Sequence, residues 1–169
     1  MRTYLDHNAG APLRPEAEAA MVAILGVPGN PSSAHREGAR ARAAVEEARA
    51  QVAALVGGMP AEIVFTSGAT EANNLALRGV CTASARGLVT TAVEHASVLE
   101  PARVLADAGV PVTVVGVDAV GRVAAADVVA ACAPVTALVS VGLANGEVGA
   151  VAPVAEITAA LILSIAELP

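Results

Sequence analysis

The sequence predicts an α/β fold, with a mainly parallel β-sheet and helices on both of its faces. Hydrophobic residues make up 55% of the 169 residues, so the chain can build a substantial core. Aromatic residues are only 1%, so this core must consist of Ala, Val, Leu and Ile, which suit the packing of helices on a sheet. Strand-like and helix-like segments also alternate along the chain, which is typical of βα units that form a parallel sheet.

Helical patterns dominate the first part of the chain. Apolar residues recur at helical spacing over residues 15–25, before a loop rich in glycine and proline. A long amphipathic helix is predicted next, because small and apolar residues recur at steps of three and four over residues 34–55. Ser32 or Ser33 is expected to cap its N-terminus, and the glycine pair that begins at Gly57 is expected to end it.

The alternation of strands and helices follows. Residues 62–66 are β-branched and aromatic and predict a strand, and residues 71–77 resume a helical pattern. Further strands are expected over residues 88–93, 111–117 and 137–143, and further helices over residues 98–108, 124–131 and from 154 onward. No internal repeat or domain boundary is visible in the sequence.

Charge and residue spacing argue against several classes of function. The net charge is -6 and the ten basic residues, all arginine, are scattered, so a nucleic-acid partner is not expected. No run of about 18 or more apolar residues occurs, so no membrane span is expected. The chain also starts without the pattern of a secretory signal, which predicts a cytoplasmic location. The spacing of Cys81, Cys132 and the histidines predicts neither a metal site nor a redox pair, and the cysteines are expected to be structural thiols.

The turn over residues 67–74 is a candidate phosphate site, because it joins a predicted strand to the start of a predicted helix. Such a junction offers free backbone N–H groups and the positive end of the helix dipole. Gly68 would permit a close approach of the ligand, and the Thr70 hydroxyl would add a donor. An ordinary capping turn is the alternative, since neither a P-loop nor a dinucleotide-binding motif is present.

Two further turns follow predicted strands and carry polar residues. His95 stands in one of them, where its ring would either cover the face of a planar cofactor or merely begin a helix. Asn145 stands in the other. Because the carboxyl ends of parallel strands meet at one edge of a sheet, residues 67–70, His95 and Asn145 are expected to surround one cleft.

Five segments of the chain resemble successive blocks of a known enzyme family. They are YLDHNAGAPLRPEA from Tyr4, GNPSSAH from Gly29, EIVFTSGATEANNLAL from Glu62, EHASVLEP from Glu94 and ALVSVGLANGEVGAVAPVAEI from Ala137. These blocks resemble the cysteine desulfurases, which are pyridoxal 5'-phosphate (PLP) enzymes of the class V aminotransferase group with a type I fold. The resemblance covers residues 3–157.

The resemblance implies a role for several residues. Ala69 and Thr70 would hold the PLP phosphate, and His95 would stack on the pyridine ring. Residues 30–35 would shape the entrance to the active site and contact the second subunit of a homodimer. Because all of these residues stand in the turns considered above, the resemblance agrees with the roles expected from the residues themselves.

The sequence departs from the family at the substrate side and in its last residues. Asn145 matches the family, but Gly146 stands where the family has a second asparagine, so a side-chain donor to the substrate carboxylate is lost. Residues 158–169 read as a divergent tail, where the family continues through the rest of the large domain into a small C-terminal domain. The Schiff-base lysine and the nucleophilic cysteine of the family have no counterpart, and no catalytic residue is assigned in this chain.

The resemblance implies the N-terminal part of a PLP-binding large domain over residues 1–157. An intact enzyme of this kind converts L-cysteine to L-alanine and passes the sulfur as a persulfide to an acceptor protein, for iron–sulfur clusters or thiolation. The truncated chain is expected to be inactive alone and to self-associate. The alternatives are a selenocysteine lyase or another class V enzyme, and a non-catalytic module that binds PLP weakly or pairs with an intact subunit.

Overall fold

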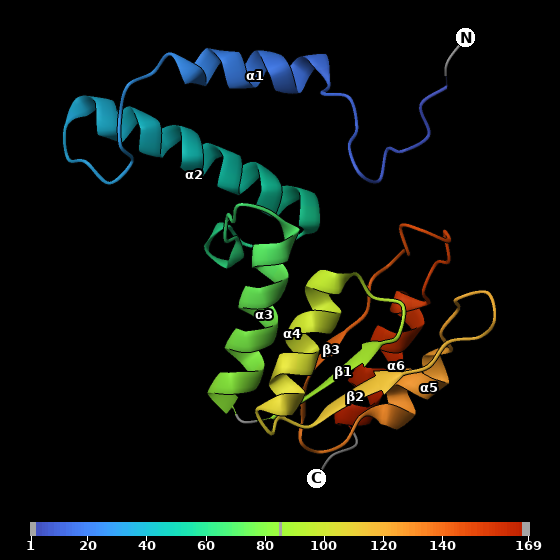
Figure 1. Ribbon diagram of the computed structural model, residues 1–169. Coiled ribbons are helices and arrows are strands. Elements are labelled where there is room, and N and C mark those ends of the chain that lie inside the picture. Colours follow the sequence, from blue (N-terminus) through green and yellow to red (C-terminus); the bar gives the residue numbers. More distant parts are fainter. Residues whose placement is uncertain (1–2, 85, 167–169) are drawn as a thin grey trace. The chain divides into compact units, whose positions relative to one another are not determined.

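The computed structural model describes residues 3–84 and 86–166, and the chain divides into two compact units, Met1–Phe65 and Thr66–Pro169 (Figure 1). The first unit contains the helices α1 (Pro15–Leu25) and α2 (Arg36–Val56) and the short 3-10 helix η1 (Pro60–Glu62). The second contains α3 (Ala69–Ser84), β1 (Gly87–Thr91), α4 (Ala96–Asp107), β2 (Val112–Val115), α5 (Ala125–Ala131), β3 (Thr136–Ser140) and α6 (Val154–Ala166). Helix α6 takes up most of the predicted tail, and residues 167–169 lie outside the described residues.

The cap of helix α2 differs from the prediction. His35 caps this helix, and its Nδ1 atom accepts a hydrogen bond of 3.2 Å from the N–H of Gly38. The predicted caps instead belong to a turn in which the Ser33 N–H donates to the carbonyl of Asn30. Only glycine fits at position 38, because a Cβ atom there would lie 2.5 Å from the carbonyl oxygen of Ser33. The turn therefore packs against the start of α2, and the helix begins after it.

The strand predicted over residues 62–66 does not form. Residues 60–62 make the 3-10 helix η1, and the backbone after it is extended but pairs with none of the described strands. A strand needs a neighbour for its N–H and C=O groups. Here the guanidinium of Arg49 bonds to the carbonyl of Ile63 and lies 5.0 Å from the centre of the Phe65 ring. A side chain of helix α2 thus takes the place of a partner strand.

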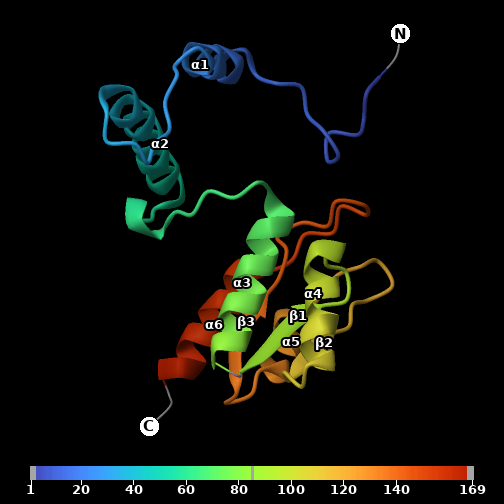
Figure 2. The ribbon, with the colours of Figure 1, turned by 60° about the vertical axis from the view of Figure 1, so that its left-hand side comes forward.

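The second unit is built on a three-stranded parallel sheet in the order β2-β1-β3. The central strand β1 is buried along its whole length. Helices α3 and α4 pack on one face and helices α5 and α6 on the other (Figure 2). The predicted α/β fold with a parallel sheet between two helical layers is therefore confirmed.

The core lies in two layers because successive residues of a strand point to opposite faces. Leu88 packs in one layer and its neighbour Val89 in the other. The buried members of the first layer are Leu77, Cys81, Leu88, Val98, Ala102 and Leu105. Those of the second are Val89, Val115, Val123, Val128 and Ile157. Both layers are almost wholly aliphatic, as the composition predicts.

The two cysteines have the environment expected of structural thiols. Cys81 is buried in the first layer of the core, Cys132 is half-buried, and neither forms a disulfide. Burial raises the pKa of both thiols. Since the thiolate is the reactive form, both side chains are poor nucleophiles.

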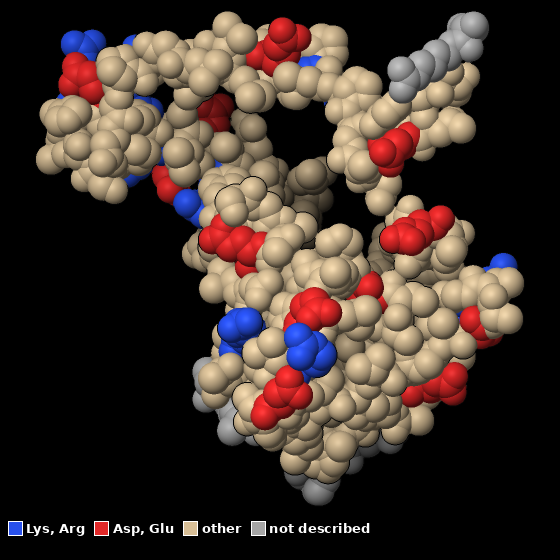
Figure 3. Space-filling model, viewed as in Figure 1, with Lys and Arg blue, Asp and Glu red and all other residues tan. Residues whose placement is uncertain are grey.

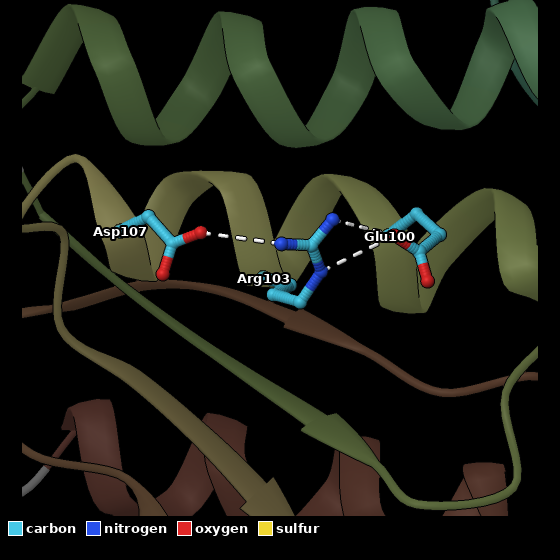
Figure 4. A network of polar contacts seen from close by, with 3 residues as sticks. All are labelled: Glu100, Arg103 and Asp107. Atoms are coloured by element: carbon cyan, nitrogen blue, oxygen red, sulfur yellow. Dashed lines mark hydrogen bonds and ion pairs between the residues drawn. The ribbon is translucent and has the colours of Figure 1, made fainter.

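Charged residues lie on the outer surface, where acidic and basic side chains are interspersed. Figure 3 shows no broad basic patch among the described residues on the face that it draws. On helix α4, Arg103 bonds both to Glu100, at 3.0 Å, and to Asp107, at 3.3 Å (Figure 4). All three side chains are exposed, so this network orients the surface of α4 and adds little to the stability of the fold.

We predict that the chain self-associates, because helix α1 buries none of its residues. Its apolar side chains include Ile24 and Leu25, and Leu25 is 78% exposed. Exposed apolar patches of this kind drive association in water. Light scattering should give a mass above the 16.6 kDa of one chain, and the double substitution Ile24→Glu and Leu25→Glu should lower it. A monodisperse monomer with a cooperative melt would contradict this prediction.

A matched pair of leucines on helix α3 tests the core. Leu77 is 2% exposed and Leu75, two residues away, is 55% exposed. Leu77→Ala should lower the free energy of unfolding by about 2–4 kcal/mol, because it leaves a cavity between α3 and the sheet. Leu75→Ala should change it by no more than about 0.5 kcal/mol. Denaturant unfolding measures both values, and equal losses would show that α3 does not pack on the sheet through this face.

Candidate functional site

The predicted phosphate turn lies at the start of helix α3. The Glu71 carboxylate turns back over this start and accepts hydrogen bonds of 2.6 Å from both the hydroxyl and the N–H of Ser67. These two bonds hold the pKa of Glu71 below its usual range. The Ser67 donors are thus occupied, whereas the N–H groups of Ala69 and Thr70 donate to no carbonyl of the described residues. The groups at this end of the helix that can bind an anion include those two N–H groups and the Thr70 hydroxyl.

His95 is the N-cap of helix α4. Its Nδ1 atom accepts a hydrogen bond of 3.0 Å from the N–H of Ser97 and lies 2.9 Å from the Ser97 hydroxyl. The Ser97 hydroxyl in turn accepts a bond of 2.8 Å from the side-chain amide of Asn73 on α3. The ring is therefore held by two helices at once.

Thr70 and His95 line one cavity of about 360 Å³ between helices α3 and α4, as the sequence predicts. The cavity continues along α3 past Asn74 to Arg78. Arg78 stands eight residues after Thr70, which places it about 12 Å further along the helix axis. The end of the cavity with Thr70 and the imidazole is therefore distinct from the end with the guanidinium.

A clamp joins the loop after β1 to the loop after β3. The Glu94 carboxylate accepts hydrogen bonds from the Gly142 N–H, at 2.9 and 3.1 Å, and from the Thr91 hydroxyl, at 2.7 Å. In the opposite direction, the Asn145 side-chain amide donates to the carbonyl of Val93 at 2.9 Å. These bonds fix the loop that carries His95 against the loop that carries Asn145.

Asn145 does not share the cavity of Thr70 and His95, so the expectation of one cleft is only partly met. It lines a second cavity of about 600 Å³, together with Val93 and Glu94. The loop over residues 93–95 separates the two cavities, because its first residues line one and His95 lines the other. The side-chain oxygen Oδ1 of Asn145 accepts from the two N–H groups of residues 147 and 148, and Gly146 lies exposed in the same turn.

Three further properties of the described residues concern metal binding, buried polar groups and membrane spans. These residues contain no group of three or more side chains that suits a metal ion. Every buried side-chain polar atom among them has a hydrogen-bond partner. None of the helices in residues 3–84 and 86–166 is long and apolar enough to cross a membrane.

Three residues position the site although the sequence predicts no role for them. They are Asn73, Glu94 and Ser97, which stand within the motifs described above. The His-x-Ser spacing at the start of a helix was the available signal for Ser97, since it allows the cap and the hydroxyl to meet. The bonds of Asn73 and Glu94 cross 24 and 48 residues of sequence, and no local pattern reveals them.

Comparison with known proteins identifies the family. The family model described as aminotransferase class-V matches residues 3–162. The chain belongs to this family. It is 43% identical to "Cysteine desulfurase IscS" of Dictyoglomus turgidum over 159 residues, which are 92% of this chain and 40% of that protein. It is 44% identical to "Putative cysteine desulfurase IscS 1" of Bacillus subtilis, over 92% of this chain and 42% of that protein.

Solved structures show the same likeness. A "NifS-like protein" superposes with a TM-score of 0.88 at 37% identity, over 94% of this chain and 45% of that one. The structure titled "SspA in complex with cysteine" gives a TM-score of 0.90 at 33% identity, over 97% of this chain and 48% of that one. The type I fold expected from the sequence is thus confirmed, and the chain spans less than half the length of these relatives.

The arrangement around Thr70 and His95 fits a ligand with an anionic end and a flat ring. The N–H groups and the positive dipole end of α3 suit a phosphate. The imidazole of His95 lines the same cavity and is fixed by Ser97. The residues present therefore fit PLP without a covalent bond, and the chain contains no lysine to form one.

We predict that Ser67 controls the titration of Glu71. Because hydrogen bonds lower the pKa of Glu71 in the folded state, they stabilise the fold fully above the unfolded pKa of about 4.3. That stabilisation is lost as the pH falls through the folded pKa. In an NMR titration, Ser67→Ala should raise the pKa of the Glu71 carboxyl, since the hydroxyl bond is the larger cause. The melting temperature of Glu71→Gln should depend less on pH below about pH 5 than that of the parent chain. An unchanged pKa in Ser67→Ala would contradict the assignment.

Proposed function

We propose that this chain is the N-terminal part of the PLP-binding large domain of a cysteine desulfurase. Residues 1–157 belong to that domain, and residues 158–169 are a divergent tail. The observation that carries the proposal is the cavity in which Thr70 and His95 meet at the start of α3. The 43–44% identity to cysteine desulfurases over about nine-tenths of the chain supports the choice of this activity within the family.

Ala69 and Thr70 bind the phosphate of PLP. Their N–H groups have no backbone acceptor among the described residues, and they point from the positive end of the dipole of a helix of 16 residues. The Thr70 hydroxyl adds a third donor. Bound PLP supplies the electron sink for chemistry at the substrate's α-carbon, and these three groups place and orient it.

His95 covers one face of the cofactor ring. Its backbone is fixed as the N-cap of α4, and its loop is fixed by the Glu94 clamp. Asn145 serves the substrate side, because its amide nitrogen has one N–H left after it bonds to Val93. Gly146 adds no side chain there, which weakens the hold on the substrate carboxylate.

The reacting groups come from residues beyond those of this sequence. Its ten basic residues are all arginine, whose guanidinium stays protonated, so the chain supplies no free side-chain amine. Cys81 and Cys132 have raised pKa values and line neither cavity described above. With those groups present, the enzyme converts L-cysteine to L-alanine and passes sulfur to an acceptor protein for iron–sulfur assembly. We place this enzyme in the cytoplasm as a homodimer.

A second candidate function follows from the missing amine. The same cavity, without any lysine in the chain, suits a non-catalytic module that binds PLP reversibly. The two candidates differ in whether a second polypeptide restores activity. Mixing the chain with the remaining part of a related desulfurase and measuring alanine formation separates them.

We predict that the chain binds PLP reversibly and that Thr70 contributes to the binding. Titration followed by PLP absorbance should give a saturable dissociation constant. Thr70→Ala should raise this dissociation constant about 10-fold, because one hydrogen bond to a charged phosphate is lost. Thr82→Ala, near the other end of the same helix, should leave it unchanged. Equal affinities of the two variants would contradict the phosphate site.

We predict that the chain alone has no cysteine desulfurase activity. Cysteine mixed with the PLP-loaded chain should form no alanine beyond that formed with PLP alone. Acetylation of the N-terminal amine should leave the dissociation constant unchanged, which excludes binding through that amine. Alanine formation above the level of free PLP would show that this chain supplies the reacting groups itself.

A further inference from the structure

Three side chains form a connected line of hydrogen bonds beside the cavity. The amide nitrogen of Asn73 lies 2.8 Å from the Ser97 hydroxyl, which lies 2.9 Å from Nδ1 of His95. Ser97 is only 7% exposed, so water competes little for its hydroxyl. The line joins α3, whose first turn carries Thr70, to the cap of α4.

The backbone decides which nitrogen of His95 carries the proton. The N–H of Ser97 points at Nδ1 from 3.0 Å, and a backbone N–H can only donate. A proton on Nδ1 would face this N–H, so Nδ1 must present its lone pair. In the neutral ring the proton therefore sits on Nε2.

The side chain of Asn73, at the other end of the line, favours the same tautomer of His95. Its NH2 group can only donate, so the Ser97 oxygen accepts from it. The single hydroxyl proton of Ser97 is then free to point at Nδ1, where it adds a second donor to the same lone pair. Backbone and side chain thus favour one tautomer, and no group in the line opposes it.

His35 shows that a histidine cap does not produce this arrangement by itself. Its Nδ1 lies 3.2 Å from the N–H of Gly38 and 3.1 Å from the carboxylate of Glu37. One neighbour is a donor and the other is an acceptor, so no single proton position satisfies both. The consistent polarity at His95 comes from the serine and asparagine beyond the cap.

We propose that Asn73 is a positioning residue, which acts through Ser97 to select the tautomer of the neutral His95 ring that has its proton on Nε2, and to fix the ring at the cavity wall. The role of that ring toward a cofactor rests on the proposed function. A neutral ring with a fixed edge stacks on a flat ligand in one orientation only. Asn73 itself need not touch the ligand.

The test compares the same substitution at two adjacent residues of α3. Asn73→Asp replaces the donor by a carboxylate that accepts a hydrogen bond from the Ser97 hydroxyl, so the hydroxyl oxygen turns its lone pair to Nδ1. Asn74→Asp adds the same charge one residue away, where the parent amide bonds only to the carbonyl of Thr70. The 15N shifts of the imidazoles, measured without PLP at alkaline pH where histidine is neutral, report the tautomer directly.

The parent chain should show His95 with an unprotonated Nδ1. Asn73→Asp should raise the Nδ1–H fraction about fivefold, the effect of one hydrogen bond, and Asn74→Asp should not. His7 and His35 serve as internal references in the same spectra. A proton on Nδ1 in the parent chain, or equal shifts in the two variants, would overturn the proposal.

A PLP titration separates this inference from the proposed function. If the parent chain binds PLP, Asn73→Asp should weaken binding about fivefold more than Asn74→Asp does. Equal weakening would overturn the positioning role toward the ligand. If the parent chain does not bind PLP, the proposed function fails, whereas the 15N result still decides whether Asn73 sets the tautomer.

Discussion

The complete burial of strand β1 is the constraint on which the second unit depends. Its neighbours β2 and β3 both run parallel to it, so all three strands end at the same edge of the sheet. No part of β1 faces water, so its polar side chains must bond within the protein. Thr90 donates to the carbonyl of Ser140 at 2.9 Å, and Thr91 donates to Glu94. The end of the strand is thereby tied to the loops that carry the site.

These bonds hold the loop residues in fixed positions. A loop that projects from a sheet is mobile unless something other than its own backbone fixes it. Here Glu94 bonds to the loop after β3, and Asn145 of that loop bonds back to Val93. The two bonds run in opposite directions across the same gap, so sliding of one loop past the other breaks both. His95 is the residue after Glu94, so the same bonds fix its position.

The sequence predicts the second unit well because its elements follow from local patterns. Aliphatic runs mark β1, β2 and β3, and helical spacing marks the helices between them. The strand expected over residues 62–66 fails because side-chain preference cannot supply a partner strand, and Arg49 takes the Ile63 carbonyl instead. The cap at His35 is a local contact with Gly38, but the serines before it are commoner caps and conceal it. The separation of Asn145 from His95 depends on how loops distant in the sequence meet, which local patterns do not contain.

The polar groups of the candidate site are of two kinds, those that bond to one another and those that have no backbone acceptor. Among the described residues, no buried side-chain polar atom is left without a partner, so the scaffold needs no ligand to complete it. Groups without a backbone acceptor among the described residues include the Ala69 and Thr70 N–H groups, at the positive end of α3. An anion placed there would displace no bond of the scaffold. In the proposed enzyme this chain therefore contributes binding and orientation, and the amine that reacts lies elsewhere, so the two contributions are separable along the sequence.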